Sequence, residues 1–189
     1  MPHEICFLEV NPGFPMSDNV IKSARILVID DEPALLNLLE TILKDAGYTN
    51  ISTTTDSVAA ISMFRNHNPD LVLLDLHMPQ QNGYEILQTV GTLVPLNAFL
   101  PIIVLTADGT SEARRRALAL GANDFIAKPF DNVEVTLRIE NILRVLFLHR
   151  QLQKEKALLE QRVRERTRSL ERIIAELRCA TLPLFSGIQ

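Results

Sequence analysis

Cysteine, tryptophan and long apolar runs are scarce or missing in this sequence, and these scarcities narrow the class of protein. The 189 residues include no tryptophan and only two cysteines, Cys6 and Cys179, which lie at opposite ends of the chain. Two cysteines so placed are typical of unpaired thiols in a reducing compartment. No apolar run approaches the roughly 18 residues that cross a bilayer, and no basic leader precedes an apolar segment near the N-terminus. We therefore predict a cytoplasmic protein without membrane contact.

A general excess of basic residues is also missing. The net charge of -4 gives no overall argument for binding to nucleic acid. The charge is uneven, however, because residues 149–178 hold nine Lys or Arg and five Asp or Glu, whereas the rest of the chain holds ten basic and eighteen acidic residues. With 47% hydrophobic residues, the chain is long enough for one domain with a core and an appendage. We expect an acidic globular domain followed by a basic C-terminal segment.

Short apolar runs alternate with amphipathic segments from Arg25 to Leu148. Each apolar run is bounded by turn residues, as buried parallel strands are, and each amphipathic segment has helical periodicity. The expected strands cover residues 25–29, 51–54, 70–75, 101–106 and 124–127. In the helix that follows Pro33, the apolar face is predicted to consist of Leu35, Leu38, Leu39 and Ile42. Five strands alternating with five helices predict an α/β fold, with a five-stranded, parallel, doubly wound sheet of the flavodoxin-like type and helices on both faces.

Polar side chains stand where four of these strands end. Asp30 and Asp31 follow the first strand, Asp75 ends the third, Thr106 ends the fourth, and Lys128 follows the fifth. In an open parallel sheet these positions converge in one crevice. Carboxylates held together repel one another and need a compensating cation, and hard oxygen ligands favour Mg²⁺. One carboxylate can then attack phosphorus, while the hydroxyl and the ammonium suit the phosphoryl oxygens, so the pattern predicts phosphoryl transfer.

Four motifs carry this pattern in a fixed order. They are Val28-Ile29-Asp30-Asp31-Glu32, Leu74-Asp75-Leu76-His77-Met78-Pro79 with Gly83, Leu105-Thr106-Ala107, and Lys128-Pro129-Phe130. With these motifs, residues 25–148 resemble the receiver domain of two-component response regulators. The resemblance implies a sensor histidine kinase as the partner. It also implies that the chain is no enzyme beyond its own phosphorylation and dephosphorylation.

The resemblance also implies a role for each residue of the metal site. Asp75 is expected to be the phosphoacceptor and, with its carboxylate, a metal ligand. Asp31 is expected to bind Mg²⁺ directly, and Asp30 mostly through water. The backbone carbonyl of His77 matches the third protein ligand of the family. The imidazole of His77 is not expected to bind the metal.

The remaining roles concern the phosphate and the switch. Lys128 resembles the lysine that binds the phosphoryl group, and Thr106 resembles the switch hydroxyl. Phe125, three residues before that lysine, sits at the position of the aromatic switch. By the same resemblance, the Lys128–Pro129 peptide bond is expected to be cis.

The C-terminal part of the chain is predicted to be one long helix. Neither glycine nor proline occurs between residues 131 and 182, and a heptad pattern of two series fits the segment. The first series is Ile142, His149, Lys156, Val163, Leu170 and Leu177. The second is Val145, Leu152, Leu159, Arg166, Ile173 and Ala180. The whole chain is then divided into a flexible leader (1–22), the receiver-like domain (23–148), a coiled-coil helix (149–180) and a tail (181–189).

The two heptad series form a stripe along one side of the helix. This stripe needs a partner, because a single helix cannot bury it. A parallel coiled-coil homodimer is the first expectation. The polar members of the stripe, and a like-charge contact between Glu155 and Glu160 of the partner chain, weaken such a dimer. A different protein is therefore the alternative partner. The basic residues are spread around the helix, so we do not expect nucleic acid to be the partner. Residues 160–167 resemble linkers to HD-GYP-type cyclic-di-GMP phosphodiesterases, diguanylate cyclases or histidine kinases. The alternative is therefore a regulatory N-terminal fragment of such an enzyme.

Overall fold

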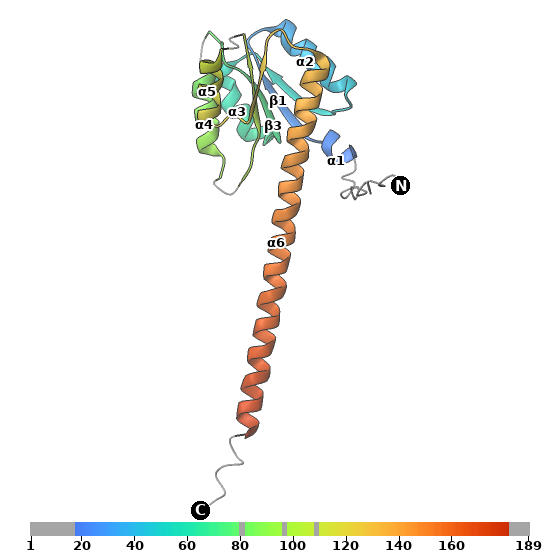
Figure 1. Ribbon diagram of the computed structural model, residues 1–189, viewed down its shortest axis with the longest axis vertical. Helices are drawn as coiled ribbons and strands as arrows, with labels where there is room; N and C mark the ends of the chain where they lie inside the picture. Colours follow the sequence, from blue (N-terminus) through green and yellow to red (C-terminus); the bar gives the residue numbers. More distant parts are fainter. Residues whose placement is uncertain (1–17, 80–81, 96–97, 108–109, 182–189) are drawn as a thin grey trace, which may run out of the picture. The chain divides into compact units, whose positions relative to one another are not determined.

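Five parallel strands form the centre of the molecule in the computed structural model (Figure 1). The structure describes residues 18–79, 82–95, 98–107 and 110–181. The strand order is β2-β1-β3-β4-β5, and every neighbouring pair is parallel. The strands are β1 (Arg25–Ile29), β2 (Asn50–Thr54), β3 (Leu71–Asp75), β4 (Ile102–Thr106) and β5 (Asp124–Ala127). The predicted sheet is confirmed.

Helices cover both faces of this sheet, as predicted. They are α2 (Pro33–Asp45), α3 (Ser57–His67), α4 (Gly83–Leu93), α5 (Ser111–Ala119) and α6 (Asn132–Thr181). Helices α3, α4 and α5 lie on one face, whereas α2 and the first turns of α6 lie on the other (Figure 1). Strands β3 and β4 are buried along their whole length. Burial on both faces explains why these strands read as unbroken apolar runs.

The apolar face of α2 differs from the predicted one. The buried side chains are Leu36, Leu39, Ile42 and Leu43, whereas Leu38 is 45% exposed and Leu35 is half-buried. In this leucine-rich helix several stripes have helical spacing, and the sheet selects the stripe that contains Leu36 and Leu43. The sequence pattern therefore predicted the helix and the buried Leu39 and Ile42 correctly, and it placed Leu38 on the buried face wrongly.

The last residues of the expected leader are structured. Residues 18–22 form the short helix α1 (Asp18–Lys22), and Ile21 is only 1% exposed. The ammonium of Lys22 lies 4.4 Å from the centroid of the Tyr48 ring. Asn50 Nδ2 donates a 2.8 Å hydrogen bond to the carbonyl of Ser23. An apolar anchor and these polar contacts attach the segment to the domain, while residues 1–17 lie outside the described residues.

Helix α6 runs without a break for 50 residues. The carboxylate of Asp131 accepts hydrogen bonds from the backbone N–H of Val133 (2.7 Å) and Glu134 (3.2 Å), which makes Asp131 its N-cap. The chain divides into two compact units, residues 1–146 and 147–189, two residues before the predicted end of the receiver domain. The residues predicted as a tail after Thr181 lie outside the description. Among the described helices, none combines the length and apolarity required to cross a membrane.

Candidate functional site

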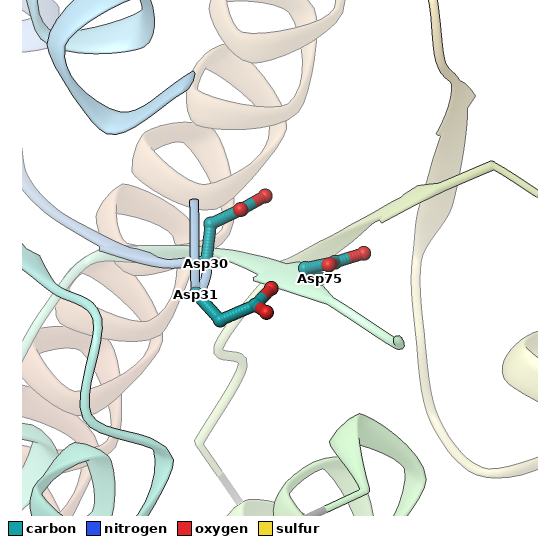
Figure 2. A group of neighbouring side chains, drawn as sticks. All are labelled: Asp30, Asp31 and Asp75. Atoms are coloured by element: carbon teal, nitrogen blue, oxygen red, sulfur yellow. The ribbon is translucent and has the colours of Figure 1, made fainter. Parts of the chain in front are cut away.

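Three carboxylates meet at the carboxyl ends of β1 and β3. Each of Asp30, Asp31 and Asp75 offers an oxygen within 4.8 Å of the others, and Figure 2 shows all three side chains pointing off the ends of these strands. Asp30 is fully buried and Asp75 is 3% exposed, while Asp31 is the most accessible. The predicted convergence is therefore present.

The local chain path explains how these side chains are held. Ile29 ends the buried strand β1, and the backbone N–H of Asp30 donates a 3.2 Å hydrogen bond to the carbonyl of Thr54 on β2. Asp30 Oδ1 in turn accepts a 3.0 Å hydrogen bond from the N–H of Glu32. Pro33 then begins α2, where a proline costs no helical hydrogen bond. These contacts fix the turn that presents both carboxylates.

Lys128 supplies the positive charge of the site. Its Nζ lies 2.7 Å from Asp30 Oδ2 and 3.3 Å from Asp75 Oδ2, so one ammonium bridges two buried carboxylates. Burial raises the pKa of Asp30 above its usual value, and the hydrogen bond from Lys128 opposes that rise. The Lys128–Pro129 bond is cis, as the resemblance implied. One cation for three carboxylates leaves the cluster short of positive charge.

The two carboxylate oxygens of Asp75 differ in their hydrogen bonding. In the part of the chain that the structure describes, Asp75 Oδ1 is buried and has no hydrogen-bond partner. A buried carboxylate oxygen without a partner is costly, and such an atom in a cleft is typical of a site that binds a cation or a reacting group. An all-oxygen donor set with a deficit of positive charge fits Mg²⁺, which Asp30, Asp31 and Asp75 would hold.

Thr106 and Phe125 lie beside this cluster on the next two strands. Thr106 ends β4, is 1% exposed, and accepts a 2.7 Å hydrogen bond at its carbonyl from the N–H of Lys128. Asp75 pairs with Leu105 in the β3–β4 register, which brings Thr106 to the strand end next to Asp75. Phe125 is half-buried on β5 and packs against the core, and Arg114 lies over its ring at 4.2 Å. The hydroxyl and the ring thus lie on the neighbouring strands β4 and β5, and their role as a switch stays a prediction.

His77 follows Asp75 by two residues, and its side chain is exposed. The expectation that the imidazole takes no part in the metal site stays a prediction. The role of its backbone carbonyl as a metal ligand stays a prediction.

Gly83, the first residue of α4, lies directly against the backbone of the site. A Cβ atom at Gly83 would lie 2.2 Å from the carbonyl oxygen of Asp75 and 2.6 Å from the Cα of Leu76. The N–H of Gly83 also donates a 3.2 Å hydrogen bond to the carbonyl of Leu76. Helix α4 therefore begins in direct contact with the Asp75–Leu76 peptide, and only glycine allows that approach.

A comparison with known proteins assigns the family. Residues 26–140 match the model of the response regulator receiver domain. The chain belongs to this family. Residues 26–140 are thus a response regulator receiver domain.

The relatives agree with this assignment. The chain is 41% identical over 124 residues to "Probable transcriptional regulator ycf27" of Porphyridium aerugineum, covering 66% of this chain and 50% of the relative. It is 37% identical to "Probable transcriptional regulatory protein TcrX" of Mycobacterium tuberculosis, covering 63% of this chain and 49% of the relative. The chain thus spans about half the length of the curated relatives that it matches.

Solved structures show the same fold. A putative response regulator from Chloroflexus aurantiacus is 33% identical with a TM-score of 0.59, and the match covers 65% of this chain and 98% of that one. NtrX from Brucella abortus is 30% identical with a TM-score of 0.64, covering 70% of this chain and 29% of that one. These matches support a receiver domain of ordinary architecture, followed here by a long helix.

Proposed function

We propose that this receiver domain accepts a phosphoryl group on Asp75 from a sensor histidine kinase in the cytoplasm, with Mg²⁺ as its cofactor. The observation that carries the proposal is the buried, unpartnered Oδ1 of Asp75 inside a cluster of three carboxylates. Asp30, Asp31, Asp75 and the backbone carbonyl of His77 are the proposed metal ligands. Mg²⁺, when bound, would supply the positive charge that the cluster lacks and would neutralise a phosphoryl oxygen.

The residues of the chain then perform the transfer. An oxygen of Asp75 attacks the phosphorus of phosphohistidine or of a small phosphodonor, an O–P bond forms, and the bond from phosphorus to the donor breaks. The donor leaves with the electron pair of the broken bond and takes up a proton. Lys128, already 3.3 Å from Asp75 Oδ2, pairs with a phosphoryl oxygen, and the Thr106 hydroxyl donates to another. Hydrolysis by water later restores the carboxylate.

The metal site can be tested without phosphate. Replacing Asp31 with asparagine removes one negative charge and one hard ligand, so we expect Mg²⁺ affinity measured by isothermal titration calorimetry to fall by about tenfold or more. Asp45→Asn is the matched control, because Asp45 is an exposed aspartate at the far end of α2. Equal Mg²⁺ affinity in the wild type and Asp31→Asn would contradict the proposed ligand set.

We further propose that the output runs through α6 and that two chains associate in parallel along it. Support comes from the exposed apolar side chains that follow the predicted heptad positions, although a different partner protein is the alternative. At the predicted heptad positions, the described apolar residues that are more than half exposed are Val145, Leu152, Leu159, Val163, Leu170 and Leu177. The names of the relatives describe regulators, which favours a regulatory output over an enzymatic one. We therefore propose a regulatory output.

Two neighbouring leucines allow a matched test of this association. Leu159 is on the stripe and Leu158 is not, while both are exposed, at 59% and 49%. A charge in the seam of a coiled coil opposes pairing, whereas the same charge outside it is solvated. Multi-angle light scattering should therefore show a dimer for the wild type and Leu158→Asp, and a monomer for Leu159→Asp. Equal masses for all three proteins would refute a homodimer through this stripe.

A further inference from the structure

Helix α5 is held to the domain in an unusual way. Of its nine residues only two alanines are buried, Ala113 and Ala117. Two small side chains bury little apolar area, so hydrophobic packing alone anchors α5 weakly. The helix also carries three consecutive arginines, all exposed, at positions 114–116. Other contacts must contribute to its position.

Two of the three arginines make those contacts through aromatic rings. The guanidinium carbon of Arg114 lies 4.2 Å from the centroid of the Phe125 ring on β5. The guanidinium carbon of Arg116 lies 4.2 Å from the centroid of the Tyr84 ring on α4. Both distances are within the range of a cation–π contact. Two arginines thus add to the two buried alanines in connecting α5 to α4 and β5.

Arg114 contacts an aromatic ring on β5, whereas Arg116 contacts a ring on α4. Phe125 pairs with Val104 in the β4–β5 register, and Ala127, two residues on, pairs with Thr106. The ring therefore belongs to the strand that borders the proposed switch hydroxyl and leads to Lys128. Arg114 covers this half-buried ring from the solvent side, so any movement of the ring must break or shift the contact.

We infer that Arg114 is a positioning residue for the switch, and that its guanidinium holds Phe125 in the conformation of the unphosphorylated domain. The inference rests on the proposed function, because it assigns Arg114 to the same switch. A contact made only in one conformation stabilises that conformation, and it opposes by the same factor any ligand that requires the other. Loss of Arg114 therefore favours phosphorylation. The free energy of an exposed cation–π contact corresponds to a roughly 2- to 5-fold change in the affinity for a phosphoryl mimic.

The neighbouring arginine supplies a control of equal charge. Arg115 is exposed, and within the described residues no ring contact or ion pair of its side chain is found. Both Arg114→Ala and Arg115→Ala remove one positive charge from α5, and alanine is a good helix former, so neither change disfavours the helix. Only Arg114→Ala removes the ring contact.

The first measurement is the affinity of the Mg²⁺-loaded full chain for beryllofluoride, a mimic of the phosphoryl group. We expect Arg114→Ala to bind it roughly 2- to 5-fold more tightly than the wild type, Arg115→Ala to bind it as the wild type does, and Arg114→Lys to lie between. Equal or weaker binding by Arg114→Ala, relative to Arg115→Ala, would overturn the inference.

The second measurement needs no phosphate mimic. In NMR spectra of the unphosphorylated chain with labelled phenylalanine, the Phe125 signal should shift and change in width in Arg114→Ala but not in Arg115→Ala or Arg116→Ala. An unchanged signal in Arg114→Ala would overturn the inference even if the domain binds beryllofluoride. If the wild type fails to bind beryllofluoride, the proposed function is wrong, and an unchanged or altered Phe125 signal still decides whether Arg114 holds the ring.

Discussion

Asp75→Asn will take up no acid-labile phosphate from acetyl phosphate and Mg²⁺, whereas the wild type will be phosphorylated. The carboxamide has nearly the shape of the carboxylate but is not a nucleophile at phosphorus. The buried cluster also loses one of three negative charges, so the substitution relieves repulsion and the fold should persist. Intact-mass spectrometry after incubation, followed by brief acid treatment, measures the labile phosphate.

The other carboxylates of the cluster are not expected to substitute for Asp75. Asp30 has its Oδ2 paired with Lys128 at 2.7 Å and its Oδ1 bonded to the N–H of Glu32 at 3.0 Å. Both of its oxygens therefore have partners, whereas Asp75 Oδ1 has no hydrogen-bond donor among the described residues. Phosphate uptake by Asp75→Asn at the wild-type level would show that another carboxylate is the acceptor. Asp45→Asn, on the exposed end of α2, should behave as the wild type.

Gly83→Ala will slow phosphorylation strongly, although Gly83 carries no functional group. The new Cβ would meet backbone atoms at 2.2 Å (Asp75 O) and 2.6 Å (Leu76 Cα), and backbone cannot rotate away as a flexible side chain does. Either α4 or the Asp75–Leu76 peptide must move. A displacement of about 1 Å at a reacting group can cost about a hundredfold in rate, and overpacking costs about 1–3 kcal/mol of stability.

Gly91→Ala is the control for this prediction. Gly91 lies within the same helix α4, and a Cβ there would meet nothing within 4 Å. Replacing a glycine in a helix interior by alanine should raise stability by about 0.5–1 kcal/mol, and the phosphorylation rate should not change. Denaturant unfolding and the rate of phosphorylation by acetyl phosphate measure both effects. Wild-type rate and stability in Gly83→Ala would contradict the proposed contact.

The sheet and the cluster could be predicted because buried parallel strands leave a simple pattern. Each apolar run is followed by a polar residue where the strand reaches the crevice, as at Asp30, Asp75 and Thr106, and the sheet topology then brings these ends together. The Asp131 cap and the uninterrupted α6 follow from equally local rules. Local patterns of this kind are visible in one sequence.

The features that the sequence did not reveal depend on contacts in three dimensions. The buried stripe of α2 was predicted with Leu35 and Leu38 instead of Leu36 and Leu43, because several leucine stripes have helical spacing and only packing chooses among them. The pairing of Lys128 with Asp30 joins residues that are 98 apart in sequence, and the resemblance had assigned Lys128 to phosphate alone. The contact of Gly83 with Asp75 likewise depends on how α4 meets β3.

Helix α1 is a further feature that the sequence did not reveal. The segment before Arg25 has too short a periodic pattern to predict a helix, yet Ile21 is 1% exposed in the structure. Its burial comes from the domain around it and not from local propensity, because a helix of five residues is not stable by itself. Sequence reasoning therefore predicted a loose leader over residues that belong to the domain.

The central claim is that Asp75 carries the phosphoryl group, and borohydride trapping tests it most directly. Sodium borohydride reduces an aspartyl phosphate to homoserine, which peptide mass spectrometry locates in the sequence. After incubation of the wild-type chain with acetyl phosphate and Mg²⁺, we predict homoserine at position 75 and an unmodified Asp30 and Asp31, with no homoserine when Mg²⁺ is omitted. Homoserine at another aspartate, or at none in the presence of Mg²⁺, would contradict the account.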